Sequence, residues 1–334
     1  MKLLKKIIKN AKKIVAVAHY NPDGDALGAS LALYLYLKNK GINSHVIVPS
    51  EGPHFLTWLP HYEKVVNFEK QQNEAVKIIK EADVIFHLDY NSIDRTKAAA
   101  EYIKHSNATM VLIDHHPNPD NTFDLVFSNT ERSSTCELLY EVLEVLGKEF
   151  IDNEIATCLF TGIMTDTLCF RVNSSNPLTF RIISKLLTYK INIEEIYNKI
   201  YDNFSPDRMR LLGHCLSHNL MIMKEYKTAY LKISRNEKAT YNLQKGDSEG
   251  FVNYPLSIKG IVFSVIFIED TGHVNISFRS KGNFDVGMFA RKHFDGGGHK
   301  NAAGGESKQS LSEAINFFIN LLPQYKESLN RNNK

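Results

Sequence analysis

The chain has 334 residues, of which 43% are hydrophobic and 23% charged, so it is long enough for two domains and too apolar to be disordered. Its net charge of +3 is too small to favour long nucleic acid as a partner, although it is compatible with a local basic pocket for a small anionic substrate. The four cysteines lack CxxC spacing, which argues against a zinc ribbon or a disulfide framework and favours reduced thiols in the cytoplasm.

The N-terminal segment, 1–13, predicts a helix. Among its lysines, apolar residues recur at helical spacing: Leu3, Leu4, Ile7, Ile8 and Ala11. We expect this helix to dock on the first domain rather than to lie on a membrane surface. The segment lacks the continuous apolar core of a signal peptide, and no stretch of the sequence is long and apolar enough to span a bilayer. We therefore expect a cytoplasmic protein that has no membrane partner.

The next segment predicts a strand, a tight turn and a helix. A short apolar run, 13–19, precedes a helix-forming run, 26–41, and the turn region holds His19, Asp23 and Asp25. In open α/β sheets, ligands bind at the carboxyl ends of such strands. The alternative is structural, with Asp25 serving only as the N-cap of the helix.

Further apolar runs at 44–50, 83–89 and 109–116 alternate with helix-length segments at 74–82 and 95–105. Strands that alternate with helices indicate βαβ units, so we predict an α/β domain whose mainly parallel sheet is flanked by helices.

From Ser133 the pattern becomes helical, and a further helix covers 205–220. Later runs predict the strands of a second, smaller α+β domain: 227–234, 260–269 and 273–280. We place the boundary near Asn219, which gives domains of residues 1–219 and 220–334.

Polar residues end three more segments of the first domain. Asp89 follows one strand, Asp114, His115 and His116 end another, and Asp166 lies in a helical segment. Carboxylates with imidazoles and without cysteine favour Mn²⁺ or Mg²⁺ over structural zinc. The candidate ligands are more numerous than one metal ion needs. Two ions sharing one carboxylate would use them all, which suits hydrolysis of a phosphoester by an activated water.

Five stretches of the sequence carry a family resemblance. They are "HYNPDGDALGAS" (19–30), "DVIFHLDYNSIDR" (83–95), "IDHHP" (113–117), "GIMTDT" (162–167) and "GGGHKNAAGG" (296–305). The first four resemble the ordered motifs of the DHH phosphoesterase superfamily, and the fifth resembles the glycine-rich signature of its DHH-associated C-terminal domain. The resemblance implies that the active site lies in the cleft between the two domains.

The resemblance also implies a ligand set for two metal ions. His19 and Asp23 would hold one ion, and Asp89 would bridge the two. The second ion would be held by Asp25, His115 and Asp166.

Two catalytic residues are implied as well. His116 would face the substrate as a phosphate stabiliser or proton donor, and Asp114 would orient the motif from behind the ligands.

In the second domain, Arg279 and the glycine-rich stretch are candidate substrate-binding residues. Glycines such as Gly297 and Gly298 let backbone amides approach an anion closely, and His299 lies in the same stretch. An arginine suits bidentate binding of phosphate. The alternatives are a tight turn that needs positive φ and a solvated arginine at a strand end.

The two-domain build resembles the stand-alone bacterial nanoRNase and 3′-phosphoadenosine 5′-phosphate phosphatase group. We therefore expect a hydrolase that carries two Mn²⁺ ions, with Mg²⁺ as a possible substitute. Its substrates would be short oligoribonucleotides, including linear dinucleotides such as pApA, and the adenosine bisphosphate. A homodimer is compatible with this expectation. The alternatives are a soluble cyclic-di-AMP phosphodiesterase and a non-catalytic nucleotide-sensing protein.

Overall fold

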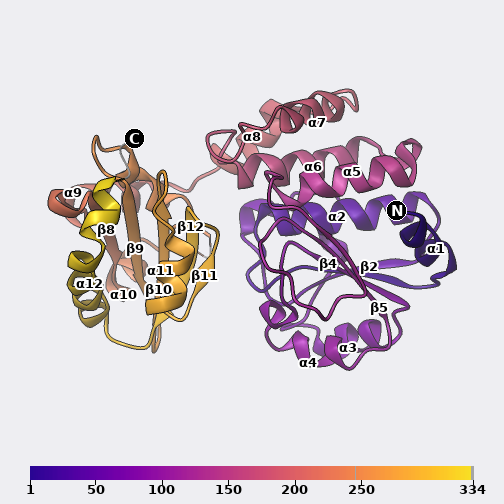
Figure 1. Cartoon of the computed structure of the whole chain (residues 1–334), viewed down its shortest axis with the longest axis horizontal. Coiled ribbons are helices and arrows are strands. Elements are labelled where there is room, and N and C mark those ends of the chain that lie inside the picture. The colour runs from indigo at the N-terminus through magenta and orange to yellow at the C-terminus, as the bar shows by residue number, and fades with distance from the viewer. Residues whose placement is uncertain (245, 332–334) are drawn as a thin grey trace. The chain divides into compact units, whose positions relative to one another are not determined.

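The computed structural model describes residues 1–244 and 246–331, and the chain forms two compact units, Met1–Asn203 and Phe204–Lys334 (Figure 1). The division falls after Asn203, whereas the sequence suggested a boundary near Asn219. The difference arises because α9 (Pro206–His218) packs its apolar face on the second sheet rather than on the first unit.

The first unit is built on a parallel sheet with strand order β3-β2-β1-β4-β5-β6. Its strands are β1 (Ile14–Val17), β2 (Ser44–Val48), β3 (Val65–Asn67), β4 (Val84–Leu88), β5 (Thr109–Asp114) and β6 (Leu125–Ser128). The predicted parallel sheet and its four predicted strands are confirmed. The edge strands β3 and β6 were not predicted, because they are short and only partly buried.

Helices cover both faces of this sheet (Figure 1). They are α1 (Lys2–Asn10), α2 (Gly24–Asn39), α3 (Gln72–Lys80), α4 (Ala99–Lys104), α5 (Thr135–Gly147), α6 (Asn153–Asp166), α7 (Pro177–Leu187) and α8 (Ile193–Tyr201). Along β1, Ile14 and Ala16 face the core that contains α2, α5 and α6, while Val15 and Val17 face α3 and α4. Burial on both faces explains why these strands are continuous apolar runs.

The N-terminal helix α1 docks on the first unit as predicted. Leu4 and Ile8 are buried in its core, whereas Leu3 is exposed. No helix in the described part of the chain combines the length and apolar character needed to cross a membrane.

The second unit has a mixed sheet with strand order β11-β12-β10-β9-β8-β7, in which only the β8–β9 pair is parallel. Its strands are β7 (Met221–Met223), β8 (Thr228–Ile233), β9 (Phe263–Glu269), β10 (Val274–Ser280), β11 (Gly297–Gly298) and β12 (Ala302–Ser307). Besides α9, its helices are α10 (Arg235–Thr240), α11 (Val286–His293) and α12 (Leu311–Arg331).

A phenylalanine-rich core joins one face of this sheet to α11 and α12, and a second core joins the other face to α9. Short 3₁₀ helices complete both units: η1 (His54–Leu56), η2 (Tyr62–Lys64), η3 (Ile93–Thr96), η4 (Lys148–Phe150), η5 (Lys224–Tyr226) and η6 (Phe251–Ser257). The smaller α+β unit expected from the sequence is confirmed.

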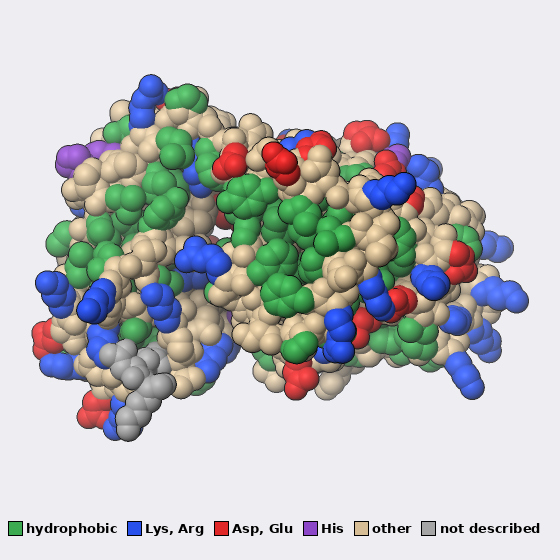
Figure 2. All heavy atoms as spheres, turned by 90° about the horizontal axis from the view of Figure 1, so that it is seen from above, with side chains coloured by type: hydrophobic (Ala, Val, Ile, Leu, Met, Phe, Trp, Pro, Cys, Tyr) green, Lys and Arg blue, Asp and Glu red, His purple; other side chains and the backbone are tan. Residues whose placement is uncertain are grey.

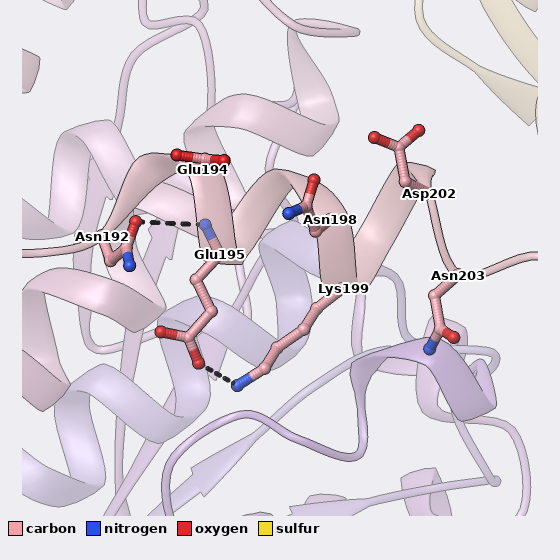
Figure 3. A pocket seen from close by; sticks show the side chains of 7 residues that line it. All are labelled: Asn192, Glu194, Glu195, Asn198, Lys199, Asp202 and Asn203. Carbon is pink, nitrogen blue, oxygen red and sulfur yellow. Dashed lines mark hydrogen bonds and ion pairs between the residues drawn. The ribbon is translucent and has the colours of Figure 1, made fainter.

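The outer surface of the first unit has two distinct features. Hydrophobic side chains gather over α7 and α8, where Phe180, Leu187 and Tyr197 are exposed (Figure 2). A shallow polar hollow also lies along α8 (Figure 3) and is lined by Asn192, Glu194, Glu195, Asn198, Lys199, Asp202 and Asn203. None of these residues belongs to the predicted site.

Candidate metal centre

Most of the predicted ligands of the first unit lie just after the carboxyl ends of β1, β4 and β5, whereas Asp166 ends α6. The strand order reverses between β1 and β4, because the chain leaves β1 toward β2 on one side and later returns to β4 on the other. Such a switch point leaves a crevice at the carboxyl ends of the strands, where α/β proteins bind ligands. His19 follows β1, Asp89 follows β4 and Asp114 ends β5.

The turn after β1 is fixed by Asp23, which is the N-cap of α2. Its Oδ1 accepts the backbone amides of Asp25 and Ala26, each at 3.1 Å. The capping role considered for Asp25 therefore belongs to Asp23. A carboxylate has two oxygens, so capping through Oδ1 leaves Asp23 able to contact a cation.

Asp25 instead accepts hydrogen bonds from the N-terminus of α5. Its two oxygens accept the amide of Thr135 at 2.6 Å and the amide of Cys136 at 2.8 Å. A Cβ on Gly162 would lie 2.9 Å from Asp25 Oδ1 and 2.2 Å from Cys136 Sγ, so only glycine lets α6 approach this closely. The helix N-terminus therefore holds this buried carboxylate in one orientation.

Asp89 is shared by three groups of possible metal ligands. Two of them match the predicted ligand set and are called the two clusters: His19, Asp23 and Asp89, and Asp25, Asp89 and His115. The third consists of Asp89, Asp114 and His116. Asp89 Oδ2 lies 3.5 Å from His19 Nε2, and its Oδ1 lies 3.6 Å from His115 Nε2. The two oxygens of one carboxylate thus face the two clusters.

The two histidines of these clusters present the same nitrogen to the carboxylates. Nδ1 of His19 contacts the carbonyl oxygen of Tyr20 at 2.8 Å, and Nδ1 of His115 contacts that of Arg132 at 3.3 Å. A carbonyl oxygen can only accept, so in the neutral ring Nδ1 carries the hydrogen and Nε2 presents its lone pair. Asp166 Oδ2 lies 3.5 Å from His115 Nε2.

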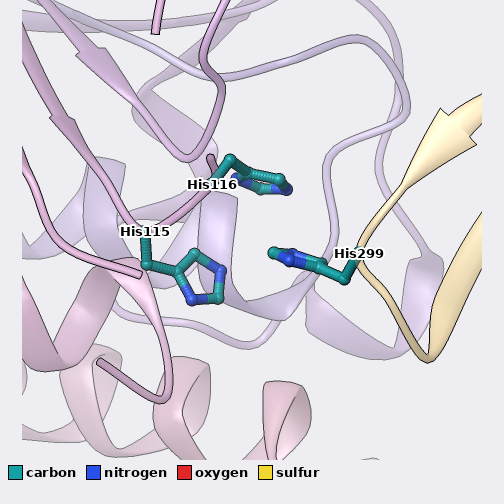
Figure 4. Close-up of side chains that lie close together, drawn as sticks. All are labelled: His115, His116 and His299. Carbon is teal, nitrogen blue, oxygen red and sulfur yellow. The ribbon is translucent and has the colours of Figure 1, made fainter. Parts of the chain in front are cut away.

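His116, drawn next to His115 in Figure 4, contacts a different partner through its Nδ1. Its Nδ1 lies 2.7 Å from Oδ1 of the fully buried Asp114 and 3.7 Å from Asp89 Oδ1. The other oxygen of Asp114, Oδ2, is buried without a hydrogen-bond partner among the described residues. Asp114 therefore orients His116.

The electrostatics of the first unit fit a cation at this site. Burial raises the pKa of Asp25 well above its ordinary value, and the charges of Asp89 and Asp166 raise it further. Burial opposes the charged form of His115, but the surrounding carboxylates outweigh burial and raise its pKa to about 9. The pKa of Asp89 is lowered, because the hydrogen bond with His19 and the charges of nearby histidines outweigh burial. Buried carboxylates this close together call for a compensating positive charge.

The predicted substrate residues of the second unit lie in or beside β10, β11 and β12, which are neighbouring strands at one edge of its sheet. Arg279 is half-buried in β10 and pairs in register with Ala302, the first residue of β12. Gly297 and Gly298 form the short strand β11 of a hairpin rather than an irregular loop, and Gly298 has a φ of 143°. His299, in the connection to β12, is half-buried (Figure 4), and its amide donates to the carbonyl oxygen of Ala302 at 2.8 Å.

Sequence reasoning missed three residues of this site. The amides of Thr135 and Cys136 hold Asp25, and the Thr135 hydroxyl donates to Asp89 Oδ1 at 3.0 Å. Ser134 and Glu137, three residues apart, are a signal for a helix start at this point. Arg95 Nη1 lies 3.2 Å from His116 Nε2, and only its place in the motif stretch 83–95 marks it in the sequence.

The chain belongs to the DHH family. Residues 13–163 match the N-terminal domain of that family, and residues 225–327 match the DHHA1 domain. A crystal structure of an exopolyphosphatase-related protein from Bacteroides fragilis is 40% identical, with a TM-score of 0.95, and the match covers 98% of this chain and 97% of that one.

Two further proteins are similar over most of this chain, one in sequence and one in fold. The bifunctional oligoribonuclease and PAP phosphatase NrnA of Thermus thermophilus is 28% identical over 309 residues, which are 92% of this chain and 88% of that protein. RecJ from Thermus thermophilus, solved in complex with Mn²⁺, shares the fold at 15% identity, with a TM-score of 0.54 over 98% of this chain and 54% of that one. The named homologues support a DHH-family phosphoesterase.

Proposed function

We propose that this protein is a metal-dependent phosphoesterase that hydrolyses short oligoribonucleotides to mononucleotides and removes the 3′-phosphate of 3′-phosphoadenosine 5′-phosphate. The proposed substrates follow from the name of the Thermus thermophilus homologue, an oligoribonuclease and PAP phosphatase. The observation that carries the proposal is the position of Asp89, whose two oxygens face two separate clusters of carboxylate and imidazole groups.

Two metal ions are assigned to these clusters. His19 and Asp23 would hold one ion, with Asp89 as the bridge, and the second would be held by Asp25, His115 and Asp166. The support is the set of distances, all within 4.0 Å, from Nε2 of each histidine to the neighbouring carboxylates. When bound, such a pair of ions lowers the pKa of a bound water, which can then attack the phosphorus, and neutralises charge on the phosphoryl oxygens.

We assign Mn²⁺ as the preferred ion, with Mg²⁺ as a substitute. Each cluster offers an imidazole as well as carboxylates, and Mg²⁺ favours an all-oxygen environment. RecJ, which shares the fold, was solved with Mn²⁺.

We assign further residues of the protein to positioning and binding of the substrate. The α5 N-terminus fixes Asp25, and Asp114 fixes His116 beside Asp89, where we place the reacting phosphate. In the second unit, we assign Arg279, Gly297, Gly298 and His299 to binding of the phosphate or nucleotide that does not react. The support is a half-buried guanidinium one strand away from a glycine hairpin.

The test is product analysis on a panel with Mn²⁺ supplied. The panel contains pApA, a short RNA, the adenosine bisphosphate, cyclic-di-AMP and inorganic polyphosphate. We expect mononucleotides from the first two and AMP from the third. Preferred turnover of cyclic-di-AMP or polyphosphate would replace the proposed substrates, and binding without turnover of any compound would mean a nucleotide-sensing protein.

Metal removal tests the ion assignment separately. Exhaustive chelation should abolish activity, and Mn²⁺ should restore it better than Mg²⁺, with two ions bound per chain by elemental analysis. Full activity after chelation would overturn the two-metal assignment. Size-exclusion chromatography of the same samples shows whether the protein forms a homodimer, which the sequence left open.

A further inference from the structure

We infer that Arg95 binds the phosphate that is being hydrolysed and that His116 anchors Arg95 instead of protonating the leaving group. This inference rests on the proposed function and adds a residue and a division of roles to it. It starts from one contact, in which Nη1 of Arg95 lies 3.2 Å from Nε2 of His116.

The backbone of Arg95 is fixed to the candidate site. Arg95 lies in η3, which follows β4 and Asp89. Its carbonyl oxygen accepts the amide of Tyr20 at 2.8 Å, which ties η3 to the turn that carries His19, and its amide donates to Ser92 at 3.0 Å. The backbone of Arg95 is therefore held by hydrogen bonds to the loops that follow β1 and β4. Its side chain reaches the loop that follows β5.

The guanidinium of Arg95 is available to an anion. It is half-buried, and within residues 1–244 and 246–331 it forms no ion pair with a carboxylate, although several buried aspartates lie in the same unit. Its side-chain contact is with a neutral acceptor nitrogen. A guanidinium has five N–H donors in a planar fork that matches two phosphate oxygens, so most of its donors can serve a substrate.

The same contact determines which ring nitrogen of His116 carries the hydrogen. An arginine only donates, so Nε2 of His116 accepts from Arg95. Nδ1 then carries the hydrogen and donates to Asp114 Oδ1 at 2.7 Å. In this arrangement His116 has no hydrogen on Nε2 to give to a leaving group, whereas it holds the guanidinium firmly in place.

The proposed role of Arg95 is therefore to stabilise the negative charge that develops on the phosphoryl oxygens. In the reaction it assists, the water oxygen bonds to phosphorus as the bond from phosphorus to the leaving oxygen breaks. The proton that the water loses balances the proton that the released alcohol gains, and no proton passes through Arg95. Groups that stabilise developing charge contribute to every substrate, whatever its leaving group.

The experiment compares Arg95→Gln and Arg95→Lys with wild type on two substrates, pApA and bis-p-nitrophenyl phosphate. We expect Arg95→Gln to lower kcat/KM by about 100- to 1000-fold on both, and Arg95→Lys by about 10-fold, since the charge remains but the fork is lost. Bound manganese and the melting temperature should stay unchanged. Arg210→Gln, which removes an exposed arginine paired with Asp207, is the control.

The leaving group separates this role from the alternative. p-Nitrophenolate departs without a proton, so if Arg95 and His116 together served to protonate the leaving group, Arg95→Gln would lose activity on pApA and retain it on the aryl ester. That result, or loss of bound manganese in both variants, would overturn the inference. If wild type hydrolyses neither substrate, the proposed function itself fails, and the variants are not needed to show it.

Discussion

The two units present their candidate residues in opposite ways. In the first, a parallel sheet gathers polar strand ends, and the gathered side chains are buried: His19, Asp25, Asp89, Asp114, His115 and His116. In the second, a mixed sheet holds Arg279 and His299 half-buried beside a glycine hairpin. Burying several carboxylates together is unfavourable without a cation, whereas a half-buried arginine can receive an anion from solvent. The contrast favours chemistry in the first unit and recognition in the second.

The units also differ in which residues adopt left-handed backbone conformations. The second unit uses mostly glycines for positive φ: Gly246, Gly250, Gly260, Gly272, Gly282 and Gly298. In the first unit, Asp89 has a φ of 68°, and Leu168, Cys169 and Phe170 have φ values of 48°, 56° and 63°. Side chains disfavour this region, so the surrounding structure must hold these residues there. Asp89 belongs to the candidate metal centre, and the run 168–170 adjoins it because it follows Asp166.

The largest effect should come from Asp89→Asn. We expect kcat to fall by more than about 1000-fold and both ions to be lost, because the shared carboxylate serves both clusters. Asparagine is chosen over alanine because it tolerates the positive φ at this position. Steady-state kinetics and elemental analysis provide the measurement.

Asp94→Asn is the matched control for this variant. Asp94 lies in η3 and forms an exposed ion pair with Lys104, so its change should leave turnover and metal content as in wild type. An Asp89→Asn protein that kept two ions and near-normal turnover would show that Asp89 is not the bridge.

A smaller and substrate-dependent effect is expected for Arg279→Ala. Loss of a charged phosphate partner costs about 2 to 3 kcal/mol at a half-buried site, or roughly 30- to 150-fold in kcat/KM. The loss should appear with pApA and the adenosine bisphosphate, which carry a second phosphate, and should be slight with an aryl phosphoester. Arg235→Ala, at an exposed position of α10, is the control. Equal losses on both substrate types would contradict a recognition role.

Much of the first unit could be predicted from its sequence, because β1, β4 and β5 are continuous apolar runs that end at residues of the candidate site. What could not be predicted was the environment of those residues. That Asp25 contacts the amides of Thr135 and Cys136 depends on packing between segments 110 residues apart. Arg95 was missed for the same reason, since only the fold brings it to His116. In the second unit, glycines gave no strand signal, so β11 was expected to be a loop.

The second unit should respond to acid through Glu237. Partial burial opposes the charged form, but hydrogen bonds from Ser234, Asn219 and His214 outweigh it and lower the pKa to about 2, from an ordinary value of 4.5. A lowered folded-state pKa stabilises the protein above about pH 4.5, and this stabilisation is lost as the pH falls toward 2. After allowance for solvent screening, we expect about 1 kcal/mol to be lost between pH 5.5 and 3.5.

The measurement is the free energy of unfolding of wild type and Glu237→Gln in urea, followed by circular dichroism at each pH. The variant should show a shallower decline in the second unit's transition. Fluorescence of Trp58, which lies in the first unit and is the only tryptophan in the sequence, is the internal control and should show no difference between the proteins. Parallel pH curves for the two proteins would mean that Glu237 does not carry the effect.

The smallest effect tests the contrast in backbone conformation. Leu168→Gly should raise the free energy of unfolding by about 0.5 to 1 kcal/mol, because glycine adopts a φ of 48° without the steric cost that leucine meets there. Part of this gain is offset by the greater freedom of glycine in the unfolded chain. Leu187→Gly, in the right-handed backbone of α7, should instead cost about 0.5 to 1 kcal/mol. Urea titrations of both variants measure these changes in the free energy of unfolding, which should have opposite signs. If Leu168→Gly were as destabilising as Leu187→Gly, the left-handed run would not be strained, and contacts of the Leu168 side chain would account for its presence beside Asp166.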